Sequence, residues 1–365
     1  MRFSVNKKEL AEAVSNLQRA VSTKTSIPAL EGILIRTDVG SIKLCAYDLE
    51  IGMQTTILAN VTEQGGIILS AKLFSEIVRK APDEIINITV DDKNIATIQS
   101  GAASFTIIGI NHEEFPELPS VGDVGCITLD GEVLKSIIRQ TIFAVAETDT
   151  KPVHQGCNFV IKDGVLDVVA VDGYRLAVRK EPVSISSHTS FVVPGKTLNE
   201  ISRLIKEGNV EICPGRRHIM FRAGSYTLTS SLLEGEFLEY EAAIPKNFAT
   251  EITLKTRELI ESVERVSLLI SDRLKSPIRC IFSEDEIKLS CTTAIGRASD
   301  TLPCKINGNS LEMGFNNRYL LDALRNTECD EVIIKLGGPL NPMVIVPKDG
   351  ESFLFLVLPV RLKSE

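Results

Sequence analysis

The spacing of apolar residues along the chain changes from that of a strand to that of a helix and back again. Residues 2–5 alternate polar and apolar side chains, as a half-buried strand does. Over residues 7–21 the apolar positions recur every three or four residues and fall on one helical face. They are Leu10, Ala13, Val14, Leu17 and Val21. Residues 32–36 and 43–47 have strand character again, and residues 72–80 form a shorter helical segment. The pattern predicts mixed α and β structure.

This order of elements returns 124 residues later, because Leu10 aligns with Leu134 and Pro28 with Pro152 without a gap. The same offset joins Val14 to Ile138, Val21 to Val145, Gly32 to Gly156, Asp48 to Asp172, Lys72 to Lys196, Glu76 to Glu200, Ile77 to Ile201 and Arg79 to Arg203. A single offset that holds over such a stretch, through a proline, a glycine and several charges, indicates an internal repeat.

A third copy follows at a slightly shifting offset. Leu259, Val263 and Pro277 align with Leu134, Ile138 and Pro152; Arg297 aligns with Arg175; Arg318, Asp322 and Arg325 align with Lys196, Glu200 and Arg203. The chain therefore reads as three tandem α+β domains, which we predict at residues 1–122, 123–249 and 250–365.

Each repeat divides into two βαβββ halves. The first strands are predicted at residues 2–5, 126–129 and 251–254, and the second helices at residues 72–80, 196–206 and 318–326. Asn6 and Asp130 stand directly before the first helices of the first two repeats and are predicted to cap them. Three such domains could form a scaffold without a common ligand or a symmetric surface for a repetitive one.

Composition narrows the class of protein. No apolar run reaches the roughly 18 to 20 residues that span a bilayer, and the first residues lack the apolar core of a signal peptide. We therefore expect a cytoplasmic protein with no membrane partner. None of the eight cysteines forms a CxxC pair, and the four histidines lack metal-ligand spacing. In a reducing compartment we expect buried free thiols and no metal.

Charge is distributed unevenly. The net charge of −8, taken alone, argues against nucleic acid as a partner. However, the six helical segments together carry +5, which leaves −13 for the rest of the chain. A weakly basic helical layer within an acidic protein suits a molecule that surrounds a polyanion without being anchored to it.

The second helices repeat one charge pattern, basic, acidic four residues later and basic three later: Lys72/Glu76/Arg79, Lys196/Glu200/Arg203 and Arg318/Asp322/Arg325. Because positions i, i+4 and i+7 share a helix face, the pattern could mark a ligand-facing surface. It could equally reflect local i,i+4 ion pairs on a solvated face.

Several segments resemble the bacterial DNA sliding clamp family, the β subunit of DNA polymerase III. Residues 169–177 (VAVDGYRLA) resemble the family's ATDGHRLA signature, and residues 357–362 (VLPVRL) its closing MPMRL. Residues 1–5, 26–30, 235–237 and 244–247 are also similar. The resemblance runs from Met1 to Leu362 with the three repeats in register. It implies a head-to-tail homodimer that closes a ring of six domains, with helices lining the hole.

The resemblance also implies positions that face DNA. Lys24 stands at a basic position of the loop after the first helix, and Lys72 and Lys196 stand at basic positions of the second helices. Thr148, Lys151, Pro152 and Val153 fall on a segment that touches DNA in the family. Some members have a polar amide and two adjacent aromatic residues where this chain has Thr148, Pro152 and Val153, so the segment departs from the family pattern there.

A docking pocket for peptides of the replicative polymerase and repair factors is implied as well. It would use His154, Val171, Gly173, Tyr174, Arg175, Leu176, Pro245, Leu356, Leu358, Pro359 and Val360. Apolar walls and a few polar groups are what a short peptide requires. Tyr174 departs from the family's frequent histidine, and Leu358 and Val360 replace methionines.

For the dimer interface, the resemblance implies an edge strand with Phe105 and Ile107 that meets Leu268 and Leu269 of a second copy. An exposed apolar edge strand is a liability unless it is paired. Alternatively, Phe105 and Ile107 belong to the core of their own domain.

Three other classes of protein remain to be compared. The sequence does not support an enzyme, because it contains no nucleophile elbow, metal cluster or GxxxxGK[ST] phosphate loop. We therefore expect no catalytic residues and no cofactor. The resemblance instead implies a separate clamp loader that spends ATP. A trimeric clamp would need two repeats per chain. The main alternative is a tandem-repeat scaffold that binds only proteins and does not encircle double-stranded DNA.

Overall fold

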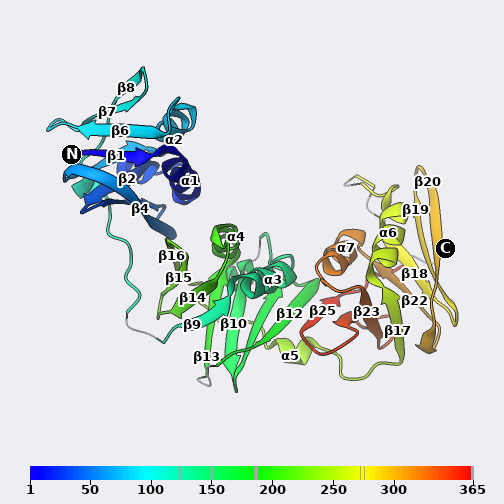
Figure 1. Ribbon diagram of the computed structural model, residues 1–365. Coiled ribbons are helices and arrows are strands. Elements are labelled where there is room, and N and C mark those ends of the chain that lie inside the picture. The colour runs from blue at the N-terminus through cyan, green and yellow to red at the C-terminus, as the bar shows by residue number, and fades with distance from the viewer. Residues whose placement is uncertain (123–124, 149–150, 185–187, 272, 275, 363–365) are drawn as a thin grey trace. The chain divides into compact units, whose positions relative to one another are not determined.

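The structure is a computed structural model that describes all residues except 123–124, 149–150, 185–187, 272, 275 and 363–365 (Figure 1). It contains two compact units. The first comprises Met1–Lys135 and Lys196–Leu232, and the second comprises Ser136–Gly195 and Leu233–Glu365. The predicted domain start at residue 123 lies outside the described residues.

The first unit holds the whole first repeat and strands of the central one. Its elements are β1 (Arg2–Asn6), α1 (Lys7–Leu17), β2 (Gly32–Asp38), β3 (Ser41–Tyr47), β4 (Ile51–Glu63), β5 (Gly66–Ser70), α2 (Ala71–Lys80), β6 (Ile85–Val90), β7 (Ile95–Ser100), β8 (Ala103–Ile108), β9 (Ile127–Asp130), β14 (Asn209–Pro214), β15 (His218–Ala223) and β16 (Tyr226–Ser231). Short 3₁₀ helices are η1 (Gln18–Ala20), η2 (Pro28–Glu31) and η3 (His112–Glu114). The strands form one 12-stranded sheet.

The second unit holds the third repeat and the other strands of the central one. Its elements are η4 (Pro152–Gln155), β10 (Gly156–Lys162), β11 (Val165–Val171), β12 (Arg175–Pro182), β13 (Thr189–Pro194), α5 (Tyr240–Ala243), β17 (Thr250–Lys255), α6 (Thr256–Ser267), β18 (Ile278–Phe282), β19 (Glu286–Thr293), β20 (Gly296–Pro303), β21 (Ile306–Gly308), β22 (Leu311–Phe315), α7 (Asn317–Arg325), β23 (Glu331–Leu336), β24 (Met343–Pro347) and β25 (Phe353–Val357). The central repeat also contributes α3 (Gly131–Ile142) and α4 (Gly195–Leu204). The strands form a nine-stranded and a four-stranded sheet.

The element order confirms the predicted α+β repeats. Each repeat runs strand, helix, three strands, then strand, helix, three strands, with β21 as a short addition in the third. Helices of one repeat lie side by side, as α1 and α2 do and as α6 and α7 do (Figure 1). Each repeat therefore consists of two βαβββ halves.

The predicted helix caps are confirmed. The Asn6 side-chain oxygen accepts hydrogen bonds from the backbone N–H groups of Lys8 at 2.9 Å and Glu9 at 3.3 Å. Asp130 accepts equivalent bonds from Glu132 at 2.9 Å and Val133 at 3.2 Å. Each side chain satisfies N–H groups that have no partner within the helix.

Strand pairing continues from one repeat into the next. In the first unit β16 of the central repeat pairs with β4 of the first, with Thr227 opposite Gln54. In the second unit β25 of the third repeat pairs with β12 of the central one, with Leu354 opposite Val178. We call these pairings the first junction and the second junction. Because hydrogen bonds cross both junctions, the compact units do not coincide with the repeats, and the domain limits remain predictions.

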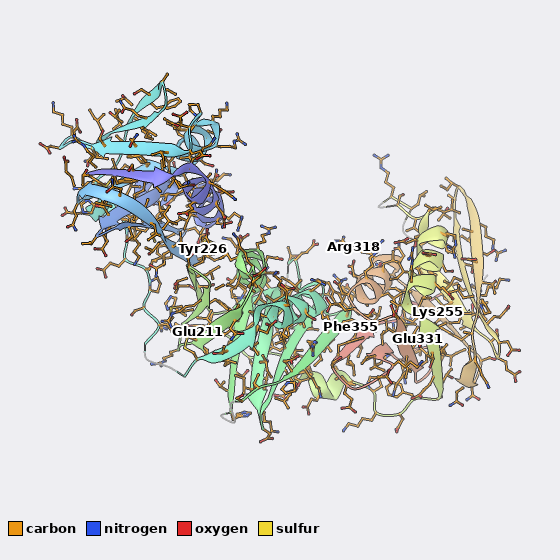
Figure 2. All side chains as sticks on the ribbon, viewed as in Figure 1. Glu211, Tyr226, Lys255, Arg318, Glu331 and Phe355 are labelled. Carbon is orange, nitrogen blue, oxygen red and sulfur yellow. A yellow bond between two sulfur atoms is a disulfide. The ribbon has the colours of Figure 1, made fainter. Side chains whose placement is uncertain are left out.

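The core beneath each sheet is built from alternating strand positions. In β3, Ile42, Leu44 and Ala46 are fully buried. In the second unit Phe355, labelled in Figure 2, is also fully buried and packs edge-on against Phe143 with the ring centroids 5.1 Å apart. These aromatic and aliphatic contacts fix the strand register that carries the functional residues.

The prediction of buried free thiols is correct for four cysteines; two others are free but only half-buried, and for the remaining two it is wrong. Cys126 and Cys213 form a disulfide, whereas the other six are free and four of those are buried. Burial raises the pKa of the Cys45, Cys157 and Cys280 thiols to about 12. The pairing arises because Ile127 of β9 faces Ile212 of β14, which brings residues 126 and 213 opposite each other with their Cα atoms 4.3 Å apart.

Candidate DNA-facing layer and peptide-docking site

The lysines predicted to face DNA differ in their surroundings. Lys24 and Lys72 are exposed, and their side-chain ammonium groups have no hydrogen-bond or ion-pair partner in the part of the chain that the structure describes. Lys151 is exposed as well. Lys196 donates to Asp48 at 2.6 Å and lies 3.6 Å from Glu50. Burial disfavours its charge, but the two carboxylates outweigh that effect and raise the pKa of Lys196. Its ammonium is thus already partly neutralised.

The segment around Lys151 contains one residue that we withdraw as a contact. Thr148 and Pro152 are exposed, but Val153 is only 3% exposed and belongs to the core. Its apolar side chain lies inward because η4 begins at Pro152 and turns the next residue toward the sheet. Val153 is therefore not available for a direct contact with DNA.

The charge pattern of the second helices does not form local i,i+4 ion pairs among the described residues. In α4, Glu200 instead accepts from Arg19 of the first repeat at 2.6 Å and from Arg203 at 2.9 Å. In α7, Asp322 accepts from Arg175 of the central repeat at 2.5 Å. In the second and third patterns, the acidic residue therefore receives an arginine from the preceding repeat and links two repeats.

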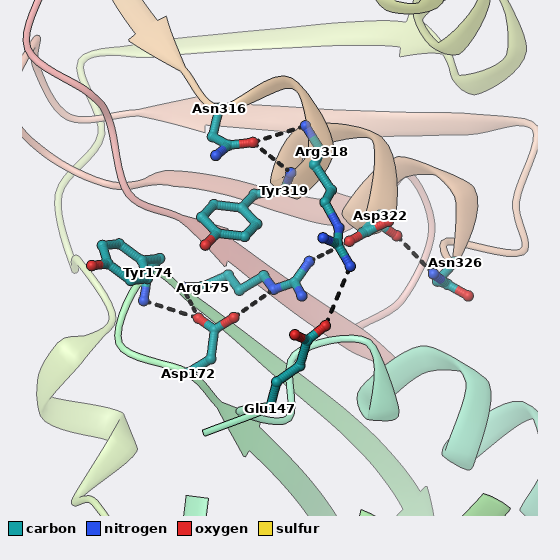
Figure 3. Close-up of polar contacts among 9 residues, drawn as sticks. All are labelled: Glu147, Asp172, Tyr174, Arg175, Asn316, Arg318, Tyr319, Asp322 and Asn326. Atoms are coloured by element: carbon teal, nitrogen blue, oxygen red, sulfur yellow. Dashed lines mark hydrogen bonds and ion pairs between the residues drawn. The ribbon is translucent and has the colours of Figure 1, made fainter. Parts of the chain in front are cut away.

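Two of the predicted docking residues, Tyr174 and Arg175, lie at a tight turn that follows β11 (Figure 3). The Asp172 Oδ1 atom accepts hydrogen bonds from the backbone N–H groups of Tyr174 and Arg175, both at 3.0 Å. Gly173 has a φ of 84°, in the left-handed region that favours glycine. The turn directs Tyr174 outward, and Tyr174 is 60% exposed.

Arg175 ties this turn to the third repeat (Figure 3). Its guanidinium donates through Nε to Asp172 at 2.8 Å and through Nη1 to Asp322 at 2.5 Å. It also lies over the ring of Tyr319, 4.7 Å from the centroid. Because the residue is only 8% exposed, these are buried charge interactions with little screening by solvent. Asp172, Arg175, Tyr319 and Asp322 form what we call the Arg175 cluster.

An exposed apolar surface borders the Arg175 cluster. Tyr174 stacks on Tyr319 with the ring centroids 5.7 Å apart and the planes at 22°. Leu358 donates its backbone N–H to the Tyr174 carbonyl at 2.9 Å, and its side chain is 37% exposed. Val360 is 41% exposed and lines a hollow of about 660 Å³ together with Ile270, Pro277, Asn316, Arg318 and Tyr319. Apolar walls with convergent polar groups suit the docking of a short peptide.

Other predicted docking residues lie beneath this surface rather than on it. Val171, Leu176 and Leu356 are buried in an apolar cluster that Phe237, Tyr240 and Phe248 cover. His154 packs edge-on against Phe237, and Pro245 and Pro359 are half-buried. The segment between β16 and β17, which contains Phe237, Tyr240 and Phe248 and which we call the connector, covers this face of the sheet. Peptide contact by Val171, Leu176 and Leu356 stays a prediction.

Sequence reasoning missed Tyr319 and Asn316. The Asn316 side chain caps α7 by accepting from the N–H groups of Arg318 at 2.9 Å and Tyr319 at 3.4 Å. The available signal was weak: Tyr319 is one of only five tyrosines in a chain without tryptophan, and it stands in an otherwise ordinary amphipathic helix.

The edge strand predicted for the dimer interface is β8, and among the described strands it pairs only with β7. β8 is the last strand of the 12-stranded sheet and β20 the last strand of the four-stranded sheet. Phe105 of β8 is 37% exposed and Leu268 is 82% exposed, while Ile107 and Leu269 are half-buried. Phe105 is thus not a core residue of its own repeat.

Two classes of site receive no support from the described residues. No group of three or more His, Cys, Asp or Glu side chains in them is placed to hold a metal ion. No helix among them is long and apolar enough to cross a membrane.

Comparison with known proteins identifies the family. Three family models match in order: the DNA polymerase III beta subunit N-terminal domain at residues 1–119, its central domain at 128–239 and its C-terminal domain at 241–361. The beta sliding clamp of Halalkalibacterium halodurans is 32% identical and that of Bacillus subtilis 31%, each over 99% of this chain and all of the relative.

Solved structures agree with these matches. The crystal structure of the DNA polymerase sliding clamp from Bacillus subtilis superposes with a TM-score of 0.97 at 30% identity over the whole of both chains. A putative DNA polymerase III beta subunit from Eubacterium rectale superposes with a TM-score of 0.94 at 34% identity over 99% of both. The chain therefore belongs to the DNA polymerase III β subunit family, the bacterial sliding clamps, which are non-catalytic processivity factors of DNA replication.

Proposed function

We propose that two copies of this chain close head to tail into a ring around duplex DNA. The observation that carries the proposal is that β8 and β20 each end a sheet and pair with only one strand among the described residues. Within the chain, the last strand of one repeat pairs with the fourth strand of the preceding repeat, as β16 does with β4 and β25 with β12. β8 is the last strand of the first repeat, and β20 is the fourth strand of the third. The same rule pairs β8 of one copy with β20 of another.

The registers of the two internal junctions support this rule. Positions 54 and 178 are repeat equivalents, because they are 124 residues apart. Position 54 faces Thr227, the second residue of β16, and position 178 faces Leu354, the second residue of β25. Equal registers mean that the two junctions pair their strands in the same way, and a heterologous contact that repeats closes a ring when its rotations add up to a full turn. Phe105, Ile107, Leu268 and Leu269 would then be covered between copies.

We propose that four lysines face DNA: Lys24, Lys72, Lys151 and Lys196. Thr148 and Pro152, which are close to Lys151 in the sequence, are proposed to face it as well. A few separated lysines favour loose, sequence-independent attraction to phosphates, which allows sliding. Lys196 contributes least, because Asp48 and Glu50 already hold its ammonium. Lys24 and Lys72 contribute most.

For partner proteins we propose docking at the exposed surface formed by Tyr174, Tyr319, Leu358 and Val360, with Arg175 holding it in place. A replicative polymerase, repair factors and a clamp loader would each present a short peptide with apolar anchor residues there. A cytoplasmic, nucleoid-associated location follows from this role.

The deciding experiment compares retention on circular and linear DNA. The protein is loaded onto nicked plasmid by its cognate clamp loader, and the plasmid is then cut once. Retention on the circle and release after cutting would support encirclement. Failure to associate, or equal retention on both forms, would contradict the ring and favour a scaffold that binds only proteins. Phe105→Asp with Ile107→Asp serves as the matched variant, and it should leave a folded chain that is not retained.

A further inference from the structure

A basic groove lies on the first unit, on the sheet face opposite to α1 and α2. Its volume is about 510 Å³. Leu34, Phe115, Leu118 and Met220 supply apolar surface. The charged lining consists of three cations and one carboxylate, Arg36, Lys43, Arg222 and Glu117, and the uncharged polar lining includes Gln54 and Thr229. These residues come from β2, β3, β4, β15, β16 and the linker after η3. We call this the basic groove.

The positive charge of the basic groove is only partly neutralised. Arg222 pairs with Glu211 at 2.8 Å, and Glu211 is labelled in Figure 2. Arg36 and Lys43 are exposed and have no ion-pair partner among the described residues. They also stand directly opposite each other on β2 and β3, an arrangement that is destabilising for like charges. An anion bound between them would relieve that repulsion.

At the second junction, the place equivalent to the basic groove is apolar and covered. Residues 54, 220 and 229 of the groove correspond to the apolar Val178, Val344 and Leu356, which belong to one buried cluster. The connector of the second unit covers that cluster with Phe237, Tyr240 and Phe248.

A side-chain hydrogen bond anchors this connector. The Tyr240 hydroxyl donates to Asp167 at 2.7 Å, and residue 167 lies at the offset of 124 from Lys43. At the second junction, the place equivalent to the basic groove is therefore filled by the chain itself, through Tyr240 of the connector. Tyr240 is flanked in sequence by Glu239 and Glu241. At the first junction, Lys43 stands at the position of Asp167, the carboxylate that accepts the Tyr240 hydrogen bond.

The linker at the first junction fills less of the space. Phe115 and Leu118 correspond to Phe237 and Tyr240, because both pairs are 122 residues apart and follow a glutamate in the segments EEFPEL and GEFLEY. Leu118 covers Gly52 so closely that a Cβ on that glycine would lie 2.2 Å from it. The residues after Leu118 that line the groove, Pro119, Ser120 and Val121, are not aromatic, and the groove stays open.

We propose that the basic groove is a second docking site, which binds a short acidic peptide segment of a partner protein that carries an aromatic anchor. The anchor would lie on Met220 and Leu118, as Tyr240 lies on its cluster, and flanking carboxylates would pair with Arg36 and Lys43. Charge-assisted hydrogen bonds to exposed cations give such a contact its specificity. The inference goes beyond clamp function and does not depend on encirclement of DNA.

The test uses a synthetic peptide with the sequence of residues 237–243 and a tryptophan in place of Tyr240. Because the chain contains no tryptophan, the fluorescence of the peptide reports binding without background. We expect saturable binding that weakens about tenfold or more in the Arg36→Glu, Lys43→Glu double variant, as loss of two charge-assisted contacts predicts. That variant keeps a like-charged cross-strand pair, so its fold is matched to the parent.

Two controls separate this site from others. Lys162→Glu with Lys180→Glu reverses two exposed charges on β10 and β12 of the second unit and should leave binding unchanged. Leu358→Ala with Val360→Ala should also leave it unchanged. Equal binding by the Arg36/Lys43 variant, or loss of binding in either control, would overturn the proposal. Retention of the Arg36/Lys43 variant on circular DNA shows that the clamp itself remains intact.

Discussion

The first and second junctions share one backbone turn but use it differently. Asp48 and Asp172 are repeat equivalents, and each accepts two backbone N–H groups, from Glu50 and Ile51 in one and from Tyr174 and Arg175 in the other. The free oxygen of Asp48 receives the exposed Lys196. That of Asp172 receives the buried Arg175.

The difference shows how repetition allows specialisation. The second junction combines a buried charge network with an aromatic connector, and this rigid support carries the exposed docking surface. The first junction keeps an ion pair with the half-exposed Lys196, a partly buried pair of Arg19 with Glu200, and a partly filled groove. Equal strand registers preserve the ring geometry in both, while side chains that do not alter the register are free to differ.

The largest effect is expected at the docking surface that the second junction alone carries. Leu358→Ala with Val360→Ala should abolish binding of a clamp-binding peptide from the cognate polymerase, because both apolar anchoring walls are removed. Fluorescence anisotropy measures the affinity and sedimentation the dimer, which should persist. Leu340→Ala, which truncates an apolar residue that is 75% exposed, serves as the control. Normal peptide affinity in the double variant would refute the assignment.

Removal of the central arginine tests the second junction itself. Arg175→Ala leaves Asp172 and Asp322 without their shared cation in a poorly solvated site, so we expect unfolding of the second unit to become easier by about 3–5 kcal/mol. The corresponding change at the first junction, Arg19→Ala, should cost about 1 kcal/mol, because Arg19 is partly solvated and Glu200 keeps Arg203. Urea unfolding measures both. Equal losses would show that the two junctions do not differ as described.

The connector anchor gives a smaller effect that depends on pH. Burial, and then the hydrogen bond to Asp167, raise the pKa of Tyr240 above its ordinary value of 10.0. A raised pKa in the folded state contributes stability that is present below pH 10 and is lost as the pH rises further. Tyr240→Phe should cost about 1–3 kcal/mol at pH 8, since the Asp167 carboxylate loses its donor. The parent should lose this contribution to stability as the pH rises above 10, and the variant, which lacks the phenol, should lose less stability over the same range. An identical pH profile in the two would exclude Tyr240 as the source.

The smallest effect is expected for the exposed ion pair of the first junction. Lys196→Ala should cost at most about 1 kcal/mol, because the ammonium is half exposed and Asp48 keeps its backbone donors. The difference should shrink in 1 M salt, where screening is strong. A loss as large as that of Arg175→Ala, in the same urea assay, would contradict the distinction between the junctions.

Much of the fold follows from local patterns. The three second helices begin and end within two residues of their predicted limits, and both predicted caps make their hydrogen bonds. The first helix was predicted to reach Val21, but α1 ends at Leu17 and continues as a 3₁₀ turn to Ala20. Such frayed ends depend on packing rather than on periodicity.

The candidate sites were less accessible to sequence reasoning. The pairing of Cys126 with Cys213 joins residues 87 positions apart, and only the register of β9 with β14 brings them together. The stacking of Tyr174 on Tyr319 and the burial of Val153 have the same origin, since neighbouring sequence does not encode contacts between distant elements. Likewise, Glu200 of α4 and Asp322 of α7 each pair with an arginine of another repeat.

The sequence by itself determined the three repeats, the βαβββ order of each half, the helix caps and the family, because these depend on spacing between nearby residues and on order along the chain. Only the tertiary structure decided which strand edges remain unpaired, which docking residues are exposed and which lie beneath the connector. It also decided that one junction is filled and the other open. The physical reason is that burial and strand register are cooperative properties of segments far apart in the chain, whereas periodicity is a property of each segment alone.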